Sequence, residues 1–75
     1  MREAYVKKSS GLLFLRVCAN QLTVCTLKLR DGAYQRERFN LTAFKSSNEC
    51  EKVYNSYIGS GVQITKDELK HPVMI

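Results

Sequence analysis

Residues 46–59 (SSNECEKVYNSYIG) constrain the fold more than any other part of this 75-residue sequence. Ser46 and Glu49 form a Ser-x-x-Glu capping box, in which two side chains can satisfy free amide groups at the start of a helix. Gly59 is suited to a left-handed C-terminal cap. Between them, apolar residues recur at the spacing of one helical face: Cys50, Val53, Tyr54, Tyr57 and Ile58. A helix of about three turns is marginal on its own, so the stripe predicts a partner surface elsewhere in the chain.

That surface is predicted to be a sheet formed by the residues before the helix. Residues 12–18 and 22–29 are rich in apolar and branched residues and predict two strands, joined by a tight turn of residues 19–21. Asp31-Gly32 is a hairpin signal, and residues 33–41 predict a third strand after it. A two-residue turn would place Leu29 on the side of Tyr34, Arg36 and Arg38, whereas a three-residue turn would pair Leu29 with Ala33.

We prefer the three-residue turn, because it collects an apolar face for the helix. In that register Gln35 and Glu37 point toward the helix side and are placed at the sheet margin. A slip of one residue moves every side chain to the opposite face, so the functional prediction depends on this choice. The predicted helix-covered residues are Leu13, Leu15, Val17, Cys25, Leu27, Leu29 and Phe39.

The predicted fold is α+β: a three-stranded antiparallel β-meander packed against one amphipathic helix, in a single small domain over residues 1–75. Residues 1–10 are either a flexible arm or an edge strand. Residues 62–64 predict a short fourth strand or extended segment. Thr65 and Glu68 form a second capping box, which opens a short helix over residues 66–71. Residues 72–75 form an apolar tail that packs on the domain or docks on a partner.

The charge of the chain is unevenly distributed. Residues 1–40 contain eight Lys or Arg and three Asp or Glu, whereas residues 41–75 contain four of each kind. The whole net charge of +5 therefore precedes the helix segment. Such asymmetry indicates an acidic partner for the N-terminal half, although a net charge of this size also serves solubility alone.

The sheet face opposite the helix holds the candidate partner-binding residues, which combine cations with aromatic rings. They are Phe14, Arg16, Lys28, Arg30, Tyr34, Arg36 and Arg38. Such a face can hold phosphates and stack against bases, and exposed Leu12, Leu22 and Val24 on it would favour some partner. The plainer interpretation is a solvated face whose charges keep the sheet from aggregating.

The layout of residues 11–58 resembles, in order and length of elements, two classes of DNA-binding domain built from a three-stranded sheet and one helix. These are a class of plant transcription-factor domains and the arm-binding domains of some phage integrases. In scale the chain is also similar to small phage-encoded inhibitors, including anti-CRISPR proteins. The first resemblance implies nucleic-acid binding by the sheet face, and the second implies stoichiometric inhibition of a partner.

The sequence predicts no catalytic residues, no cofactor and no metal site. Cys18, Cys25, Cys50 and His71 make up a Cys3His set in number, but their spacings of 7, 25 and 21 lack the close ligand pair of structural zinc sites. Three cysteines without a Cys-x-x-Cys pair are typical of reduced thiols. No apolar run approaches the ~20 residues of a membrane span, so we expect a cytoplasmic protein without a membrane partner.

We therefore expect a non-enzymatic binding module that acts as a stoichiometric inhibitor or regulator. Its partner would be an acidic protein surface or a nucleic-acid-binding protein complex. Two alternatives stay open at this stage. The same face could bind DNA or RNA directly, or it could close a homodimer.

Overall fold

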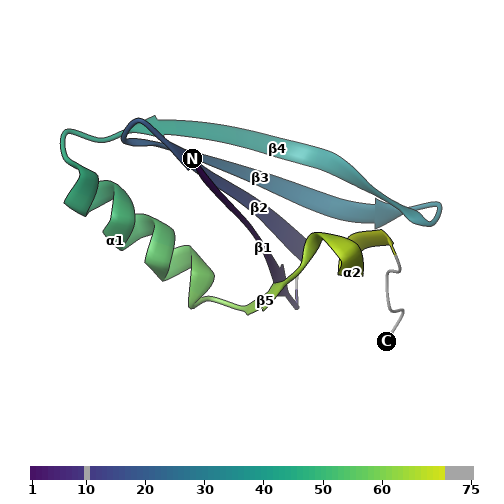
Figure 1. The fold of residues 1–75 in the computed structure, drawn as a ribbon. Helices are drawn as coiled ribbons and strands as arrows, with labels where there is room; N and C mark the ends of the chain where they lie inside the picture. Colours follow the sequence, from purple (N-terminus) through teal and green to yellow (C-terminus); the bar gives the residue numbers. More distant parts are fainter. Residues whose placement is uncertain (10, 71–75) are drawn as a thin grey trace.

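The computed structural model describes residues 1–9 and 11–70 of the chain. One antiparallel sheet has the strand order β4-β3-β2-β1-β5, and helix α1 lies across one of its faces (Figure 1). The α+β class is confirmed, but the sheet has five strands and is larger than the predicted meander. The elements are β1 (Arg2–Lys8), β2 (Gly11–Cys18), β3 (Gln21–Arg30), β4 (Ala33–Ala43), α1 (Ser47–Ile58), β5 (Val62–Ile64) and α2 (Lys66–Lys70).

The N-terminal segment is a strand and not a flexible arm. β1 pairs with β2 along its whole length, and its residues 5–7 also pair with β5 on the other side. Residues that face α1 alternate along β1 with residues that face away from it, which explains why a basic segment forms a strand. Ala4 and Val6 point to the α1 side and are 4% and 0% exposed. The extra strands also correct the comparison with three-stranded DNA-binding sheets, since β1 and β5 lie outside the predicted meander.

The turn between β2 and β3 has two residues, and the prediction of three was wrong. Cys18 pairs with Gln21, so only Ala19 and Asn20 connect the strands, with φ angles of 50° and 60°. Two successive positive φ angles belong to the tight hairpin turn that matches the twist of the strands. The shorter turn shifts β3 by one residue, so Leu22 and Val24 face α1 whereas the intervening residues face away.

The turn between β3 and β4 also has two residues, which contradicts the preferred register. Arg30 pairs with Ala33, and Asp31 and Gly32 have φ angles of 53° and 80°. Farther along, β4 contains a β-bulge: Leu27 pairs with Arg36 and Thr26 pairs with Arg38, which leaves Glu37 as the extra residue. A bulge reverses the alternation of faces on the strand that contains it.

The apolar stripe of α1 packs on the sheet, as predicted, but it covers strands β1 to β3 and not the three strands of the predicted meander. Cys50 and Tyr54 are 1% and 7% exposed, and Val53, Tyr57 and Ile58 pack against the same core. From the sheet, the core contains Ala4, Val6, Leu13, Leu15 and Leu22, with Val17, Val24 and Phe44 partly buried against them. Of the predicted helix-covered residues, those on β2 are correctly placed, but Cys25, Leu27, Leu29 and Phe39 lie on the opposite face.

The ends of α1 follow local chemistry. The Ser46 hydroxyl accepts a hydrogen bond from the Glu49 amide at 3.3 Å, which confirms the predicted cap. Gly59 is not left-handed: its φ of −75° and ψ of −7° are right-handed, and its N–H donates to the Asn55 carbonyl at 3.0 Å. At the entry to the helix, the Phe44 N–H donates to the Asn20 carbonyl at 2.9 Å and ties it to the β2–β3 turn.

α1 crosses the sheet because it connects strands at opposite edges, β4 and β5. After β5, the Thr65 N–H donates to the Glu68 carboxylate at 3.1 Å, which is one of the two hydrogen bonds of the predicted second capping box at α2. The predicted tail over residues 72–75, and His71, lie outside the described residues. Neither helix in the described part of the chain has the length and apolar character needed to cross a membrane.

Candidate binding surface

The sheet face turned away from α1, called the outer face below, carries a row of aromatic and apolar side chains. Tyr5, Phe14, Cys25 and Phe39 are successive cross-strand partners on β1 to β4, and Ile64 of β5 extends the row beyond Tyr5. The rings of Tyr5 and Phe14 are 5.1 Å apart between centroids and tilted by 43°. Strands lie about 4.8 Å apart, so the row from β1 to β4 is roughly 14 Å long.

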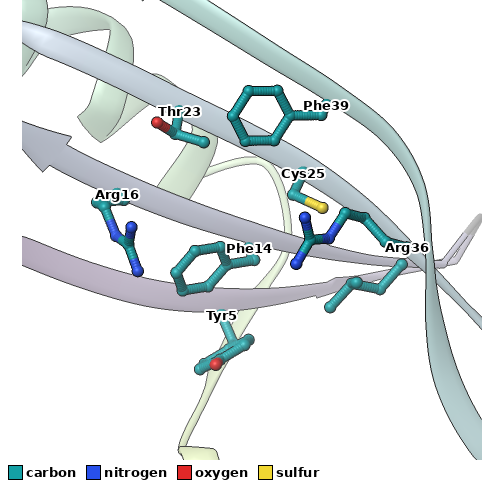
Figure 2. Close-up of a pocket in the computed structure, with 8 residues that line it drawn as sticks. Tyr5, Phe14, Arg16, Thr23, Cys25, Arg36 and Phe39 are labelled. Atoms are coloured by element: carbon teal, nitrogen blue, oxygen red, sulfur yellow. The ribbon is translucent and has the colours of Figure 1, made fainter.

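Two arginines flank this row from opposite sides. Figure 2 shows Arg16 on one side of Phe14 and Arg36 on the other, with the guanidinium of Arg36 directed toward Cys25 and Phe14. Arg16 lies 5.5 Å from the Phe14 ring centroid, and its Nε and Nη2 donate to Glu3 at 2.8 and 2.7 Å. Arg36 forms no ion pair with any residue that the structure describes. Arg36 is therefore the cation of the row that is available to an acidic group from outside.

Between the rings and the arginines the outer face is hollowed. The hollow has a volume of about 280 Å³, just below the ~300 Å³ at which pockets for drug-sized ligands begin. A hollow of this volume is large enough for a single side chain or a single base. Its lining consists of Tyr5, Phe14, Arg16, Thr23, Cys25, Leu27, Arg36 and Phe39.

The bulge at Glu37 divides the predicted candidate residues between the two faces. Before it, Tyr34 and Arg36 pair with Leu29 and Leu27 and lie on the outer face. After it, Arg38 pairs with Thr26 and lies on the α1 side, where its N–H donates to the Thr26 hydroxyl at 3.0 Å. The prediction that Arg36 and Arg38 share one face is therefore wrong.

Lys28 and Arg30 also lie on the α1 side, because they alternate with Leu27 and Leu29 along β3. They belong to the end of the β3–β4 hairpin that continues past β2, whose last pair with β3 joins Leu12 to Leu27. Arg30 pairs with Glu37 at 3.1 Å there. Of the predicted binding residues, the outer face thus keeps Phe14, Arg16, Tyr34 and Arg36, and the α1 side receives Lys28, Arg30 and Arg38.

Sequence reasoning missed the contributions of Tyr5 and Phe39 to this surface. Tyr5 was missed because residues 1–10 were undecided, although Ala4, Val6 and Tyr5 already show the alternation of a half-buried strand. Phe39 was assigned to the helix side, yet it is 59% exposed on the outer face. Leu41, on the same strand and face, is 55% exposed.

The three cysteines lie apart from one another. Cys50 is buried on the sheet-facing side of α1, Cys25 is buried in the outer-face row, and Cys18 is exposed at the end of β2. Within the described ranges, no three His, Cys, Asp or Glu side chains come together in a group that could hold a metal ion. His71, the fourth member of the numerical Cys3His set, lies outside those ranges.

Comparison of the chain with models of protein families, with curated proteins and with solved structures gave no match.

Proposed function

We propose that this chain is a non-enzymatic binding module that docks on an acidic protein surface through the outer face of its sheet. The supporting observation is the row of Tyr5, Phe14 and Phe39 flanked by Arg36, an arginine with no ion-pair partner among the described residues. Aromatic residues and arginine are the types enriched in the buried centres of protein interfaces. A chain of this size suits a stoichiometric inhibitor or regulator, and its place of action is proposed to be the cytoplasm.

The distribution of Lys and Arg between the two faces of the sheet favours a protein over a nucleic acid as the main partner. Lys28, Arg30 and Arg38 lie on the other side of the sheet, and Arg16 is already engaged by Glu3. The outer face is thus less basic than the sequence suggested, and Glu3 would repel a phosphate placed near Arg16. An apolar surface with one available guanidinium fits a partner that presents a carboxylate beside an apolar patch.

The test is affinity capture from cells of the source organism with three forms of the chain: wild type, Arg36→Glu and Lys28→Glu. The two variants make the same charge change on opposite faces of the sheet. We expect a protein that wild type and Lys28→Glu retain and that Arg36→Glu loses. A protein retained by Arg36→Glu and lost by Lys28→Glu would show that the outer face is the wrong surface.

A second variant measures the contribution of the rings. Phe39 is 59% exposed, so Phe39→Ala removes a contact without opening the core. Once a partner is in hand, we expect this truncation to weaken binding by about 1–2 kcal/mol, or roughly 5- to 30-fold, as for aromatic residues near an interface centre. An unchanged dissociation constant would exclude the row from the interface.

Single-stranded nucleic acid is the second candidate, because rings on neighbouring strands with cations beside them form a stacking platform. The test is a titration of a fluorescent single-stranded oligonucleotide at two salt concentrations. A complex with phosphates must weaken with salt, by about 0.7 in log K per contacted phosphate for each log unit. Absence of binding at low salt would remove this candidate, and nuclease treatment of the captured sample separates the two candidates in a lysate.

A further inference from the structure

β4 is an edge strand, and on the side turned away from β3 it pairs with no other strand of the described chain. It is 11 residues long, and all of its residues except Tyr34 are exposed. Two of them, Phe39 and Leu41, are among the large apolar residues with the highest exposure. A long edge with exposed apolar side chains is a template for pairing with another strand.

The bulge and the charges of β4 restrict which strand can pair there. Both features commonly prevent edge-to-edge association, because a bulge breaks the regular ladder and like charges repel. A partner strand must therefore match the reversal of faces at Glu37 and supply charges opposite to Glu37 and Arg38. A second copy of β4 does both, in one register.

That register has a twofold axis between Glu37 and Arg38. Antiparallel pairing about this axis places Glu37 opposite Arg38 of the second copy, and Arg38 opposite its Glu37. Arg36 then lies opposite Phe39 of the second copy, with both side chains on the outer face. The complete set of pairs is Ala33 with Thr42, Tyr34 with Leu41, Gln35 with Asn40, Arg36 with Phe39 and Glu37 with Arg38.

Every pair in this register joins two residues of the same face. Tyr34, Arg36, Phe39 and Leu41 all lie on the outer face, because the bulge reverses the alternation between Arg36 and Phe39. Side chains directly opposite one another in a sheet must lie on one face, and amide directions alternate with the faces. Moving the axis onto Glu37 would oppose Glu37 to itself and Arg36 to Arg38, which combines like charges with a mismatch of faces.

We propose that β4 pairs with β4 of a second copy about this axis, which joins the two sheets into one. Each opposite-charge cross-strand pair contributes a factor of roughly 1.4 to 5 to the association constant, and the symmetry provides two such pairs. Within one copy Glu37 already contacts Arg30 at 3.1 Å, so in the dimer this carboxylate lies between two guanidinium groups. Pairing in the plane of the sheet leaves the outer face open, so this inference does not rest on the proposed partner.

Sedimentation velocity from about 1 µM to about 1 mM, the range of weak protein–protein affinities, tests the dimer. We expect a reversible monomer–dimer equilibrium for the wild type. Arg38→Glu and Glu37→Lys each replace two attractive pairs by two repulsive ones, so each variant alone should dimerise at least roughly fourfold more weakly. Mixed in equal amounts, the two variants should form a heterodimer, because their reversed charges are again complementary across the axis.

Lys52→Glu on α1 is the matched control, because it makes the charge change of Arg38→Glu at an exposed position away from β4. It should dimerise like the wild type, and circular dichroism should show all variants folded. A wild type that stays monomeric over the whole range overturns the proposal. So does a dimer that Arg38→Glu and Lys52→Glu weaken equally, a dimer unaffected by the edge variants, or a mixture that fails to recover association.

Discussion

Replacing Leu22 by alanine tests which face of β3 is covered by α1. Leu22 is 2% exposed in the core, whereas Leu41, on the neighbouring strand but on the outer face, is 55% exposed. Leu22→Ala removes buried methyl groups and leaves a cavity, which costs about 2–5 kcal/mol in well-packed cores. At roughly 0.05–0.15 kcal/mol per residue, a 75-residue chain has only about 4–11 kcal/mol of stability to lose.

The assay is urea unfolding followed by circular dichroism, at a protein concentration low enough to keep the chain monomeric. We expect Leu22→Ala to lower the midpoint strongly at an unchanged m-value, and Leu41→Ala to change the free energy of unfolding by no more than about 0.5 kcal/mol. The three-residue turns predicted from the sequence give a different result, because they place Leu22 on the face away from the helix, where Leu22→Ala would cost little. A larger loss for Leu41→Ala than for Leu22→Ala would refute the observed register.

Two further pairs of substitutions, each a test and its matched control, probe backbone positions. A Cβ on Gly61 would overlap the backbone of β1. Gly61→Ala should therefore lower the free energy of unfolding by about 1–3 kcal/mol and speed amide exchange in β5. Gly59→Ala is the control: the nearest contact of its Cβ would be 3.5 Å away, so the free energy of unfolding should change by no more than about 0.5 kcal/mol. Ala19 has a φ of 50°, so Ala19→Gly should stabilise the chain by about 1 kcal/mol, measured as a higher melting temperature. Ala33→Gly is the control, because Ala33 is not left-handed, and it should destabilise the chain by about 0.5–1 kcal/mol. A higher melting temperature for Ala33→Gly than for Ala19→Gly would contradict the turn geometry.

The parts of the fold that depend on short-range chemistry could be predicted from the sequence. Each predicted capping box forms one of its two hydrogen bonds within its own first turn, and the stripe of α1 is set by the helical repeat alone. The short strand β5 agrees with the fourth strand or extended segment predicted for residues 62–64. None of these features requires knowledge of what lies on the neighbouring strand.

The register of β3 could not be predicted, because it depends on a turn with an unfavourable residue. A two-residue turn of this type is normally signalled by Asn-Gly or Asp-Gly, and here Ala19 occupies the first left-handed position. Left-handed alanine costs about 1–2 kcal/mol, so local preference favours a longer turn. Burial of Leu22 and Val24 under α1 outweighs that cost, and this gain is visible only after the helix is placed.

The bulge at Glu37 had no signal in the sequence either, and it decides what the basic half of the chain can do. Counting charges gave +5 for residues 1–40, but charge counting assigns no face. An uninterrupted β4 would have carried Arg36 and Arg38 on one side as a single patch for phosphates. With the bulge, Arg36 joins the rings of the outer face, and Arg38 stands beside Glu37 at the edge. The same reversal gives residues 33–37 and residues 42–38 the same order of faces along the strand. The two halves of β4 can therefore pair about a twofold axis at the Glu37–Arg38 bond. The bulge thus removes a basic patch that would suit a polyanion and leaves an edge strand that can pair with β4 of a second copy.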